Sequence, residues 1–221
     1  MSAGSSAQAR AAALRAAQQP ADWWLRLQVR LGVAAAIAPE AGADAARWEA
    51  GAEGERRTAA LLMPLAEEGW YGLWDRHVPD SARANADHVL ITPGGRALLA
   101  DAKLWSGKYR VRIRNGRLHH GDSDYGDSID NVRYEASQIQ KAIRRQLGLR
   151  GSSLVVTPLI VMHNAPVDNG GFTHQGVRVV PADRAVAVLR SLAGLPDPAL
   201  AATVAAAAES VLPRYVEGSR R

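Results

Sequence analysis

The sequence predicts one main domain of the α/β (α+β) class. Its segments follow one another as helix, strands, helix, strand and helix, which is typical of a sheet flanked by helices. Two pairs of neighbouring strands are joined by short runs of turn-forming residues. Hydrophobic residues make up 47% of the 221 residues, enough for a buried core. The length suits one ordinary domain with extensions.

The N-terminal part is predicted to be a helical extension. Residues 1–44 are rich in Ala and Arg, and Pro20 and Pro39 interrupt them. Between these prolines, residues 23–37 have the apolar spacing of an amphipathic helix. The first helix of the main domain is predicted at residues 45–68.

Strands follow, and two turns define how they pair. Pro93-Gly94-Gly95 joins two apolar runs, and Asn115-Gly116 is the strongest short hairpin signal in the chain. A later apolar run contains Pro158, which must therefore lie at an edge or a bulge. The predicted strands are residues 72–78, 88–92, 96–103, 109–114, 117–120, 153–162 and 176–180.

The remaining segments are an acidic loop and three helices. Residues 121–130 contain four aspartates and are predicted to be a solvated loop. The helices are predicted at residues 131–149, 183–193 and 198–212. We divide the chain into an extension at 1–44, a main domain at 45–195 and a C-terminal helix and tail at 196–221.

Charge and cysteine content limit the function. The chain has no cysteine, which excludes disulfides and thiolate metal sites and favours a reducing compartment. A net charge of +5 permits a polyanionic partner. The apolar run at residues 31–38 is too short to span a bilayer. We therefore expect a cytoplasmic protein with no membrane partner.

The turn at Pro93-Gly94-Gly95 brings two aspartates together. A hairpin that is symmetric about Gly94 places Asp87 opposite Asp101, with Lys103 on the same face. Two facing carboxylates repel each other unless a cation or a proton lies between them. The pattern is consistent with a divalent metal beside a lysine, whereas a simple salt bridge of Lys103 with one aspartate is the ordinary alternative.

A third carboxylate comes from the helix at residues 45–68. Glu55 shares a stripe with Ala52 and Leu62, so it is predicted to point toward the sheet. An equally acceptable interpretation is that Glu55 is an acidic residue in the first turn of a fraying helix.

These residues resemble a known family. The stretches "WEAGAEGERRTAALL" and "ANADHVLITPGGRALLADAKLWSGK" look like the nuclease-related domain (NERD) family of the PD-(D/E)xK superfamily. The resemblance implies a restriction-endonuclease-like mixed central sheet flanked by helices. It also implies metal-dependent hydrolysis of phosphodiester bonds in DNA.

Carried over residue by residue, the resemblance implies a catalytic set and a metal site. The implied catalytic residues are Glu55, Asp87, Asp101, Lys103 and Gln138. Mg²⁺ or Mn²⁺ would be held by Asp87, Asp101 and the Ala102 carbonyl, with Glu55 as a further ligand. Asp101 stands where many members have Glu. The usual Asn-Pro before the helical glutamine is absent, and Gln140 competes with Gln138.

Basic residues that alternate along the hairpin at 109–120 are the predicted nucleic-acid surface. Their like charges face one another, so either the acidic loop neutralises them or they follow a phosphate backbone. The second interpretation is favoured, since the opposite face is apolar. The assigned residues are Lys108, Arg110, Arg112, Arg114, Arg117, Lys141, Arg144 and Arg145.

Two other functions remain open. One is a non-catalytic DNA-binding module that keeps the basic surface. The other is a protein-interaction scaffold or homo-oligomer that uses Trp23, Trp24 and the N-terminal extension.

Overall fold

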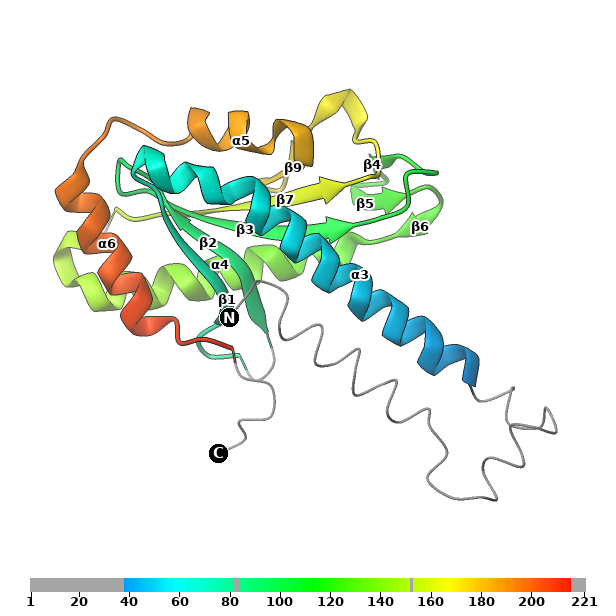
Figure 1. The fold of residues 1–221 in the computed structure, drawn as a ribbon, viewed down its shortest axis with the longest axis horizontal. Coiled ribbons are helices and arrows are strands. Elements are labelled where there is room, and N and C mark those ends of the chain that lie inside the picture. The colour runs from blue at the N-terminus through cyan, green and yellow to red at the C-terminus, as the bar shows by residue number, and fades with distance from the viewer. Residues whose placement is uncertain (1–37, 82–83, 152, 216–221) are drawn as a thin grey trace, which may run out of the picture.

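The computed structural model describes residues 38–81, 84–151 and 153–215 (Figure 1). The predicted helix at residues 23–37 and the Trp23–Trp24 interface therefore lie outside the described residues. The class is α/β, with a six-stranded mixed sheet, a second three-stranded sheet and helices around them. The predicted fold class is confirmed.

The six-stranded sheet has the order β1-β2-β3-β7-β9-β8. Its first three strands are antiparallel, β3, β7 and β9 are parallel, and β8 returns antiparallel at the far edge. The strands are β1 Tyr71–His77, β2 Asn85–Ile91, β3 Ala97–Leu104, β7 Val156–His163, β8 Phe172–His174 and β9 Val177–Pro181. The short strand β8 is not among the predicted elements.

The three-stranded sheet consists of β4 Val111–Arg114, β5 Arg117–His120 and β6 Ser123–Asp124. It lies beyond the C-terminal ends of β3 and β7 (Figure 1). The Asn115-Gly116 turn pairs Arg114 with Arg117 and Arg112 with His119, as predicted. Both turn residues have positive φ, which is the conformation that favours Asn-Gly.

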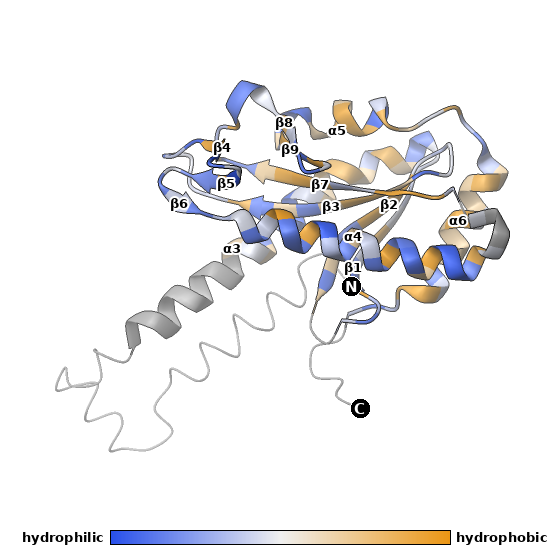
Figure 2. Cartoon of the chain, turned by 180° about the vertical axis from the view of Figure 1, so that it is seen from behind, coloured by the Kyte–Doolittle hydropathy of each residue, from blue (hydrophilic) through white to orange (hydrophobic). Residues whose placement is uncertain are grey.

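Helices cover both faces of the large sheet. On one face lie α3 Ala38–Leu62, the 3₁₀ helix η2 Met63–Glu68 and α5 Ala182–Ser191; on the other lie α4 Gly126–Leu147 and α6 Pro198–Val211. Short 3₁₀ turns occur at η3 Gly148–Gly151 and η4 Asp168–Gly170. Hydrophobic residues line β3 and β7, while α4 alternates hydrophobic and hydrophilic positions (Figure 2). None of the described helices is long and apolar enough to cross a membrane.

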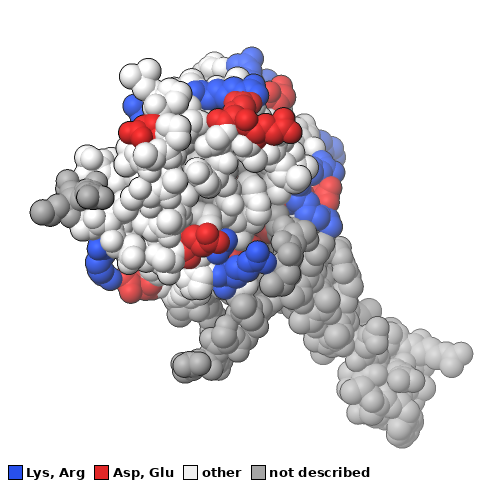
Figure 3. Space-filling view, turned by 60° about the vertical axis from the view of Figure 1, so that its left-hand side comes forward, with Lys and Arg blue, Asp and Glu red and all other residues white. Residues whose placement is uncertain are grey.

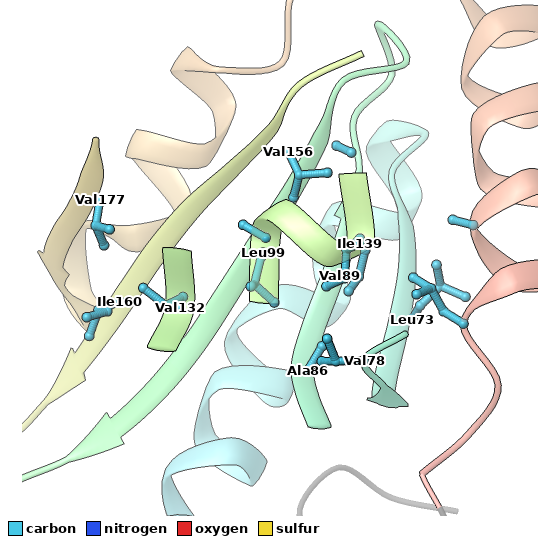
Figure 4. Close-up of a cluster of buried hydrophobic side chains, with 14 of the residues drawn as sticks. Leu73, Val78, Ala86, Val89, Leu99, Val132, Ile139, Val156, Ile160 and Val177 are labelled. Atoms are coloured by element: carbon cyan, nitrogen blue, oxygen red, sulfur yellow. The ribbon is translucent and has the colours of Figure 1, made fainter. Parts of the chain in front are cut away.

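The main core lies between the sheet and α4. Val89 and Leu99 on the sheet pack with Val132 and Ile139 of α4 (Figure 4). Val204 and Ala208 of α6 belong to the same cluster. Odd-numbered residues of β3 therefore face α4, and even-numbered residues face α3 and α5.

Several predicted boundaries differ from the structure, most clearly at the first helix and at the acidic segment. The first helix begins at Ala38 rather than at residue 45, which agrees with the high helix propensity of its alanines. The acidic segment at 121–130 is not one loop, because it contains β6 and the first turn of α4. Asp124 causes the early start of α4, since its Oδ1 accepts a hydrogen bond from the N–H of Gly126 at 2.7 Å.

Pro158 lies where the sequence requires it. It is opposite Leu99 on β3, but the pairing of β7 with β9 begins only at Leu159. At Pro158, β7 is therefore locally an edge strand, and the missing N–H leaves no gap in a ladder.

Candidate active site

The candidate site lies in a fork between β2 and β3. The ladder joins Ile91 to Ala97 and ends at His88 and Ala100, so the register about Gly94 is the predicted one. One step further, the Oδ2 of Asp87 accepts a hydrogen bond from the N–H of Ala102 at 2.9 Å. A side chain thus takes the place of a main-chain partner where the strands separate.

Asp101 and Lys103 form a close ion pair on β3. The Nζ of Lys103 donates to the Oδ1 of Asp101 at 2.7 Å. The Oδ2 of Asp101 is also 2.7 Å from this Nζ, but it is buried and accepts no hydrogen bond of suitable geometry. Burial lowers the pKa of Lys103, but the charges of Asp101 and Asp87 outweigh it and the net pKa lies above the usual value. Lys103 is therefore a fixed cation.

Glu55 reaches the fork from α3. The His88 ring, whose two nitrogens lie 3.1 Å from the carbonyl oxygens of Ala100 and Glu55, joins α3 to the sheet at this point. Close packing also contributes, since a Cβ on Gly54 would lie 3.2 Å from the Cβ of Leu104. The helix therefore rests almost directly on β3 beside Glu55.

The Glu55 carboxyl group is buried without a partner. The residue is 7% exposed, and its Oε2 has no hydrogen bond within the described part of the chain. Burial, followed by the charges of Asp87, Asp75 and Asp101, raises the pKa of Glu55 to about 9. Burial and Asp101 likewise raise the pKa of Asp87 to about 7. These shifts mean that the fork has more carboxylate than its one lysine neutralises.

Glu135 of α4 completes the group, and the sequence analysis missed it. Burial, then Asp101 and Asp87, raise the pKa of Glu135 to about 9, and Glu135 in turn raises that of Lys103. Glu135 therefore faces the fork from the side of the sheet opposite to Glu55. An available signal was its position three residues before Gln138, on the same flank of the helix.

The two candidate glutamines have different environments. Gln138 is half-buried, and its side chain makes no hydrogen bond to another described residue. The Oε1 of Gln140 accepts from the N–H of Val156 at 3.0 Å, which ties α4 to the start of β7. Gln140 is therefore a structural residue, whereas Glu135 is an α4 side chain that interacts electrostatically with the fork.

Asp75 of β1 was also not predicted. Trp74 pairs with His88 and Arg76 with Ala86, so the register puts Asp75 next to Asp87 across the strands. Asp75 has a φ of 50°, an unusual left-handed conformation within a strand. Its charge contributes to the raised pKa of Glu55. Predicting this register from the sequence would have required locating the turn between β1 and β2. That turn has no strong sequence signal.

The C-terminal segment supports this edge of the sheet. The N–H of Tyr215 donates to the Asp75 carbonyl at 2.9 Å, and the N–H of His77 donates to that of Pro213 at 2.8 Å. Arg76 is buried, and its Nη1 donates to the carbonyl of Leu212 at 3.1 Å. This guanidinium caps the end of α6 and holds β1 beside it.

The donor atoms of the fork suit a hard divalent cation. Asp101 Oδ2, which is ion-paired with Lys103, and Glu55 Oε2 are buried carboxylate oxygens without a hydrogen bond of suitable geometry, and such oxygens are the ligands that Mg²⁺ and Mn²⁺ prefer. Across residues 38–81, 84–151 and 153–215, however, no three His, Asp or Glu side chains are grouped closely enough to hold a metal ion together. The donor set therefore fits one ion with two aspartates better than a cage that includes Glu55.

The predicted nucleic-acid surface is partly engaged with acids. Arg114 lies 3.3 Å from Asp122, and Arg117 lies 2.6 Å from Asp124. The acidic segment thus folds back on the hairpin, which is the first of the two interpretations above. Exposed ion pairs contribute only about 0–1 kcal/mol, so such arginines can still exchange carboxylate for phosphate.

The other basic residues are in varied positions. Arg110 lies 3.5 Å from Asp168, and the Nε of Arg112 is buried without a partner in the described residues. Arg144 donates from its Nε to the carbonyl of Leu154 at 2.7 Å, so it is a structural link. Lys108, Lys141 and Arg145 are exposed.

A cavity of about 360 Å³ lies at the opposite end of β3 and is separate from the fork. Its wall includes Gly95, Leu147 and Leu200, and none of the fork residues. The side of the molecule that carries α6 has few charged side chains at its centre (Figure 3). That side is therefore poorly suited to a polyanion.

A comparison with family models gives one match. The model described as nuclease-related domain (NERD) matches residues 50–163, which is more than half of the chain. The chain belongs to this nuclease-related domain family. The matched region runs from α3 to β7 and contains Glu55, Asp87, Asp101, Lys103 and Glu135. Neither the curated proteins nor the solved structures give a match. The family predicted from the sequence is confirmed, and it makes a nuclease-related function the starting point for interpreting the fork.

Proposed function

We propose that this NERD-family protein is a metal-dependent nuclease that hydrolyses phosphodiester bonds in DNA. The observation that carries the proposal is the fork itself, where Asp87 and Asp101 lie beside Lys103 and the buried carboxyl groups of Glu55 and Glu135 are near enough to be affected by their charges. Such an excess of carboxylate is costly to bury unless cations balance it. A bound divalent ion and a substrate held through that ion would provide the balance.

The metal ligands in this proposal are Asp87, Asp101 and the Ala102 carbonyl. A divalent ion held there would lower the pKa of a bound water and offset negative charge on the scissile phosphate. Asp87 is positioned for this task by the N–H of Ala102, and Asp101 by Lys103. Mg²⁺ and Mn²⁺ both suit these oxygen donors.

Lys103 would act on the phosphate or on the attacking water. Its ammonium group carries three donors, of which Asp101 accepts one. The others can stabilise charge that develops on the phosphate oxygens. Because its net pKa is raised, Lys103 acts as an electrostatic donor and is not the general base.

Glu135 is a second polar residue of α4, beside the predicted Gln138, that would act on the phosphate. In the metal-free protein, burial, Asp101 and Asp87 raise the pKa of its carboxyl group to about 9, so the group holds a proton at neutral pH. A protonated carboxyl group can donate a hydrogen bond to a phosphate oxygen, as an amide would. Glu135→Gln should therefore retain far more activity than Glu135→Ala.

Incubation of supercoiled plasmid with Mg²⁺, with Mn²⁺ and with EDTA tests the function. Nicking is expected with metal, and none with EDTA. Asp101→Asn and Lys103→Met should each lower the rate by at least about 100-fold, because each removes an interaction made in the transition state. Asp183→Asn, at an exposed site on α5, is the matched control and should be fully active.

Two other outcomes of the plasmid assay would contradict the proposal. Equal nicking by wild type, Asp101→Asn and Lys103→Met would show that the fork is not the active site and that a contaminant is responsible. DNA binding by wild type without any nicking would favour the non-catalytic DNA-binding module.

A further inference from the structure

Four aromatic rings cluster directly after β3. The ring centroid of Trp105 lies 4.3 Å from that of Tyr125 and 5.2 Å from that of His120. The centroid of Tyr109 lies 5.6 Å from that of His120, in an edge-to-face arrangement. These rings come from the end of β3, the loop before β4, the end of β5 and the start of α4. The cluster therefore joins the small sheet to the fork.

His120 holds the cluster together. It is buried, and its Nε2 lies 2.8 Å from the carbonyl of Ser106, so this nitrogen is the donor and the ring is fixed. Tyr109 rests on Gly121, where an added Cβ would be 3.0 Å from the tyrosine ring. The N–H of Tyr125 donates to the carbonyl of Leu118 at 2.7 Å. The rings are therefore held in place before any partner binds.

Two of these fixed rings remain open to solvent. Tyr109 is 52% exposed and Tyr125 is 37% exposed, although large aromatic residues usually bury more of their surface. Rigid, exposed aromatic rings lose little conformational entropy when a partner stacks on them. Lys108 and Arg110 flank Tyr109 in the chain and are exposed. A cationic backbone contact beside aromatic faces is the combination used to bind single strands of nucleic acid.

The cluster is close to the proposed catalytic lysine. Trp105 follows Lys103 by two residues, so their Cα atoms are at most about 7 Å apart. The aromatic cluster therefore begins directly beside the fork in the chain. Bases in a duplex are covered by their neighbours, whereas unpaired bases offer their faces to such rings.

We propose that Trp105, Tyr109 and Tyr125 form a stacking platform for unpaired bases of a DNA strand whose backbone enters the fork. This inference rests on the proposed nuclease function and narrows its substrate to DNA with a single-stranded segment. His120 is a positioning residue, because it holds the three rings and does not face the strand.

Fluorescence anisotropy in EDTA tests the platform without cleavage. The probes are a labelled oligothymidylate, the same strand with abasic sites in place of the bases, and a duplex. Wild type should bind oligothymidylate roughly tenfold more tightly than the abasic strand. Tyr109→Ala and Tyr125→Ala should each lose most of this preference and leave duplex affinity unchanged.

Matched variants separate stacking from folding. Tyr71→Ala removes a tyrosine on β1 whose exposure, 43%, lies between those of Tyr109 and Tyr125, and it should leave all three affinities unchanged. Tyr109→Phe keeps the ring and should keep the preference, whereas Tyr109→Leu keeps the bulk and should lose it. Circular dichroism melting curves for each variant identify any loss of fold.

The outcomes distinguish failure of the platform from failure of the nuclease. If wild type nicks plasmid with Mg²⁺ but Tyr109→Ala and Tyr125→Ala bind oligothymidylate as wild type does, the platform is wrong and the nuclease stands. Equal wild-type affinity for oligothymidylate and the abasic strand also overturns the platform. The exposed rings would then be assigned to an interface with another protein. If wild type neither nicks plasmid nor binds any probe, both proposals fail.

Discussion

At the residue scale, the balance of charge in the fork dominates the chemistry. Asp87 and Asp101 lie next to each other with one lysine, and Glu55 and Glu135 approach from the two faces of the sheet. Burial, together with nearby carboxylates, raises the pKa values of Glu55, Asp87 and Glu135. The fork is therefore expected to respond strongly to divalent metal and to pH.

Metal should stabilise the folded protein through the two aspartates. A ligand that binds the folded state alone raises the free energy of unfolding by mass action. Mg²⁺ or Mn²⁺ should therefore raise the Tm of wild type, and Asp101→Asn should remove most of this shift. Differential scanning calorimetry with metal and with EDTA measures it. The same metal-induced shift in both proteins would place the ion elsewhere.

The pH dependence of stability should reveal Glu55. Its pKa is about 9 when folded, against a usual value of 4.5. The folded state thus favours the protonated form, and this stabilisation is complete below about pH 4.5 and is lost as pH rises toward 9. The Glu55→Gln side chain cannot ionise, so the variant avoids that loss. In EDTA its free energy of unfolding should exceed that of wild type, by at most about 3 kcal/mol at pH 7. Urea unfolding across this range measures the difference, and parallel stability curves would contradict it.

At the element scale, the contact of α3 with β3 decides where Glu55 lies. Gly54 touches Leu104, whereas a Cβ on Gly51 would meet no atom within 4 Å. Both glycines lie in the same helix, so the same substitution at each isolates the contact.

Replacing Gly54 should move the helix away from the sheet. Gly54→Val is expected to destabilise the fold by about 1–3 kcal/mol through overpacking and to lower nicking, because Glu55 moves with the helix. Gly51→Val should be nearly neutral, since Val has a slightly better helix propensity than Gly. Thermal melts and plasmid assays of the pair provide the test. Equal effects at both positions would mean that the helix does not rest on β3 at Gly54.

At the scale of the whole molecule, the distribution of charge decides which surface could bind a nucleic acid. The side with α6 has few charges at its centre, while the basic hairpin lies beyond the ends of β3 and β7 (Figures 1 and 3). Several hairpin arginines are paired with acids. A phosphate backbone would have to displace those acids.

The salt dependence of DNA binding should report this exchange. Replacing Arg110, Arg112 and Arg114 with Gln should flatten the slope of log K against log salt by roughly two to three units. Asp122→Asn frees Arg114 and should strengthen binding at low salt. Anisotropy titrations at several salt concentrations measure both effects. A triple variant with the wild-type slope would assign these arginines to the acidic segment alone.

The sequence by itself determined the features that depend on local rules. Short turns are encoded locally, so Asn115-Gly116 and Pro93-Gly94-Gly95 were enough to predict both hairpin registers. The register then placed Asp87 beside Asp101, and the pattern around them identified the family. Pro158 was restricted to an edge or a bulge, because a proline has no N–H to donate to a ladder.

Only the tertiary structure decided which distant side chains share the fork. Glu135 of α4 acts on Lys103 in addition to the predicted residues, and Asp75 lies beside Asp87. Helical spacing shows which residues share a flank of α4. It does not show the angle and depth at which α4 crosses the sheet, and this packing geometry decides which residues of the flank reach the fork. The raised pKa of Glu55 likewise depends on burial between α3 and the sheet. Packing between elements far apart in the chain has no local signal, so it appears only in the folded molecule.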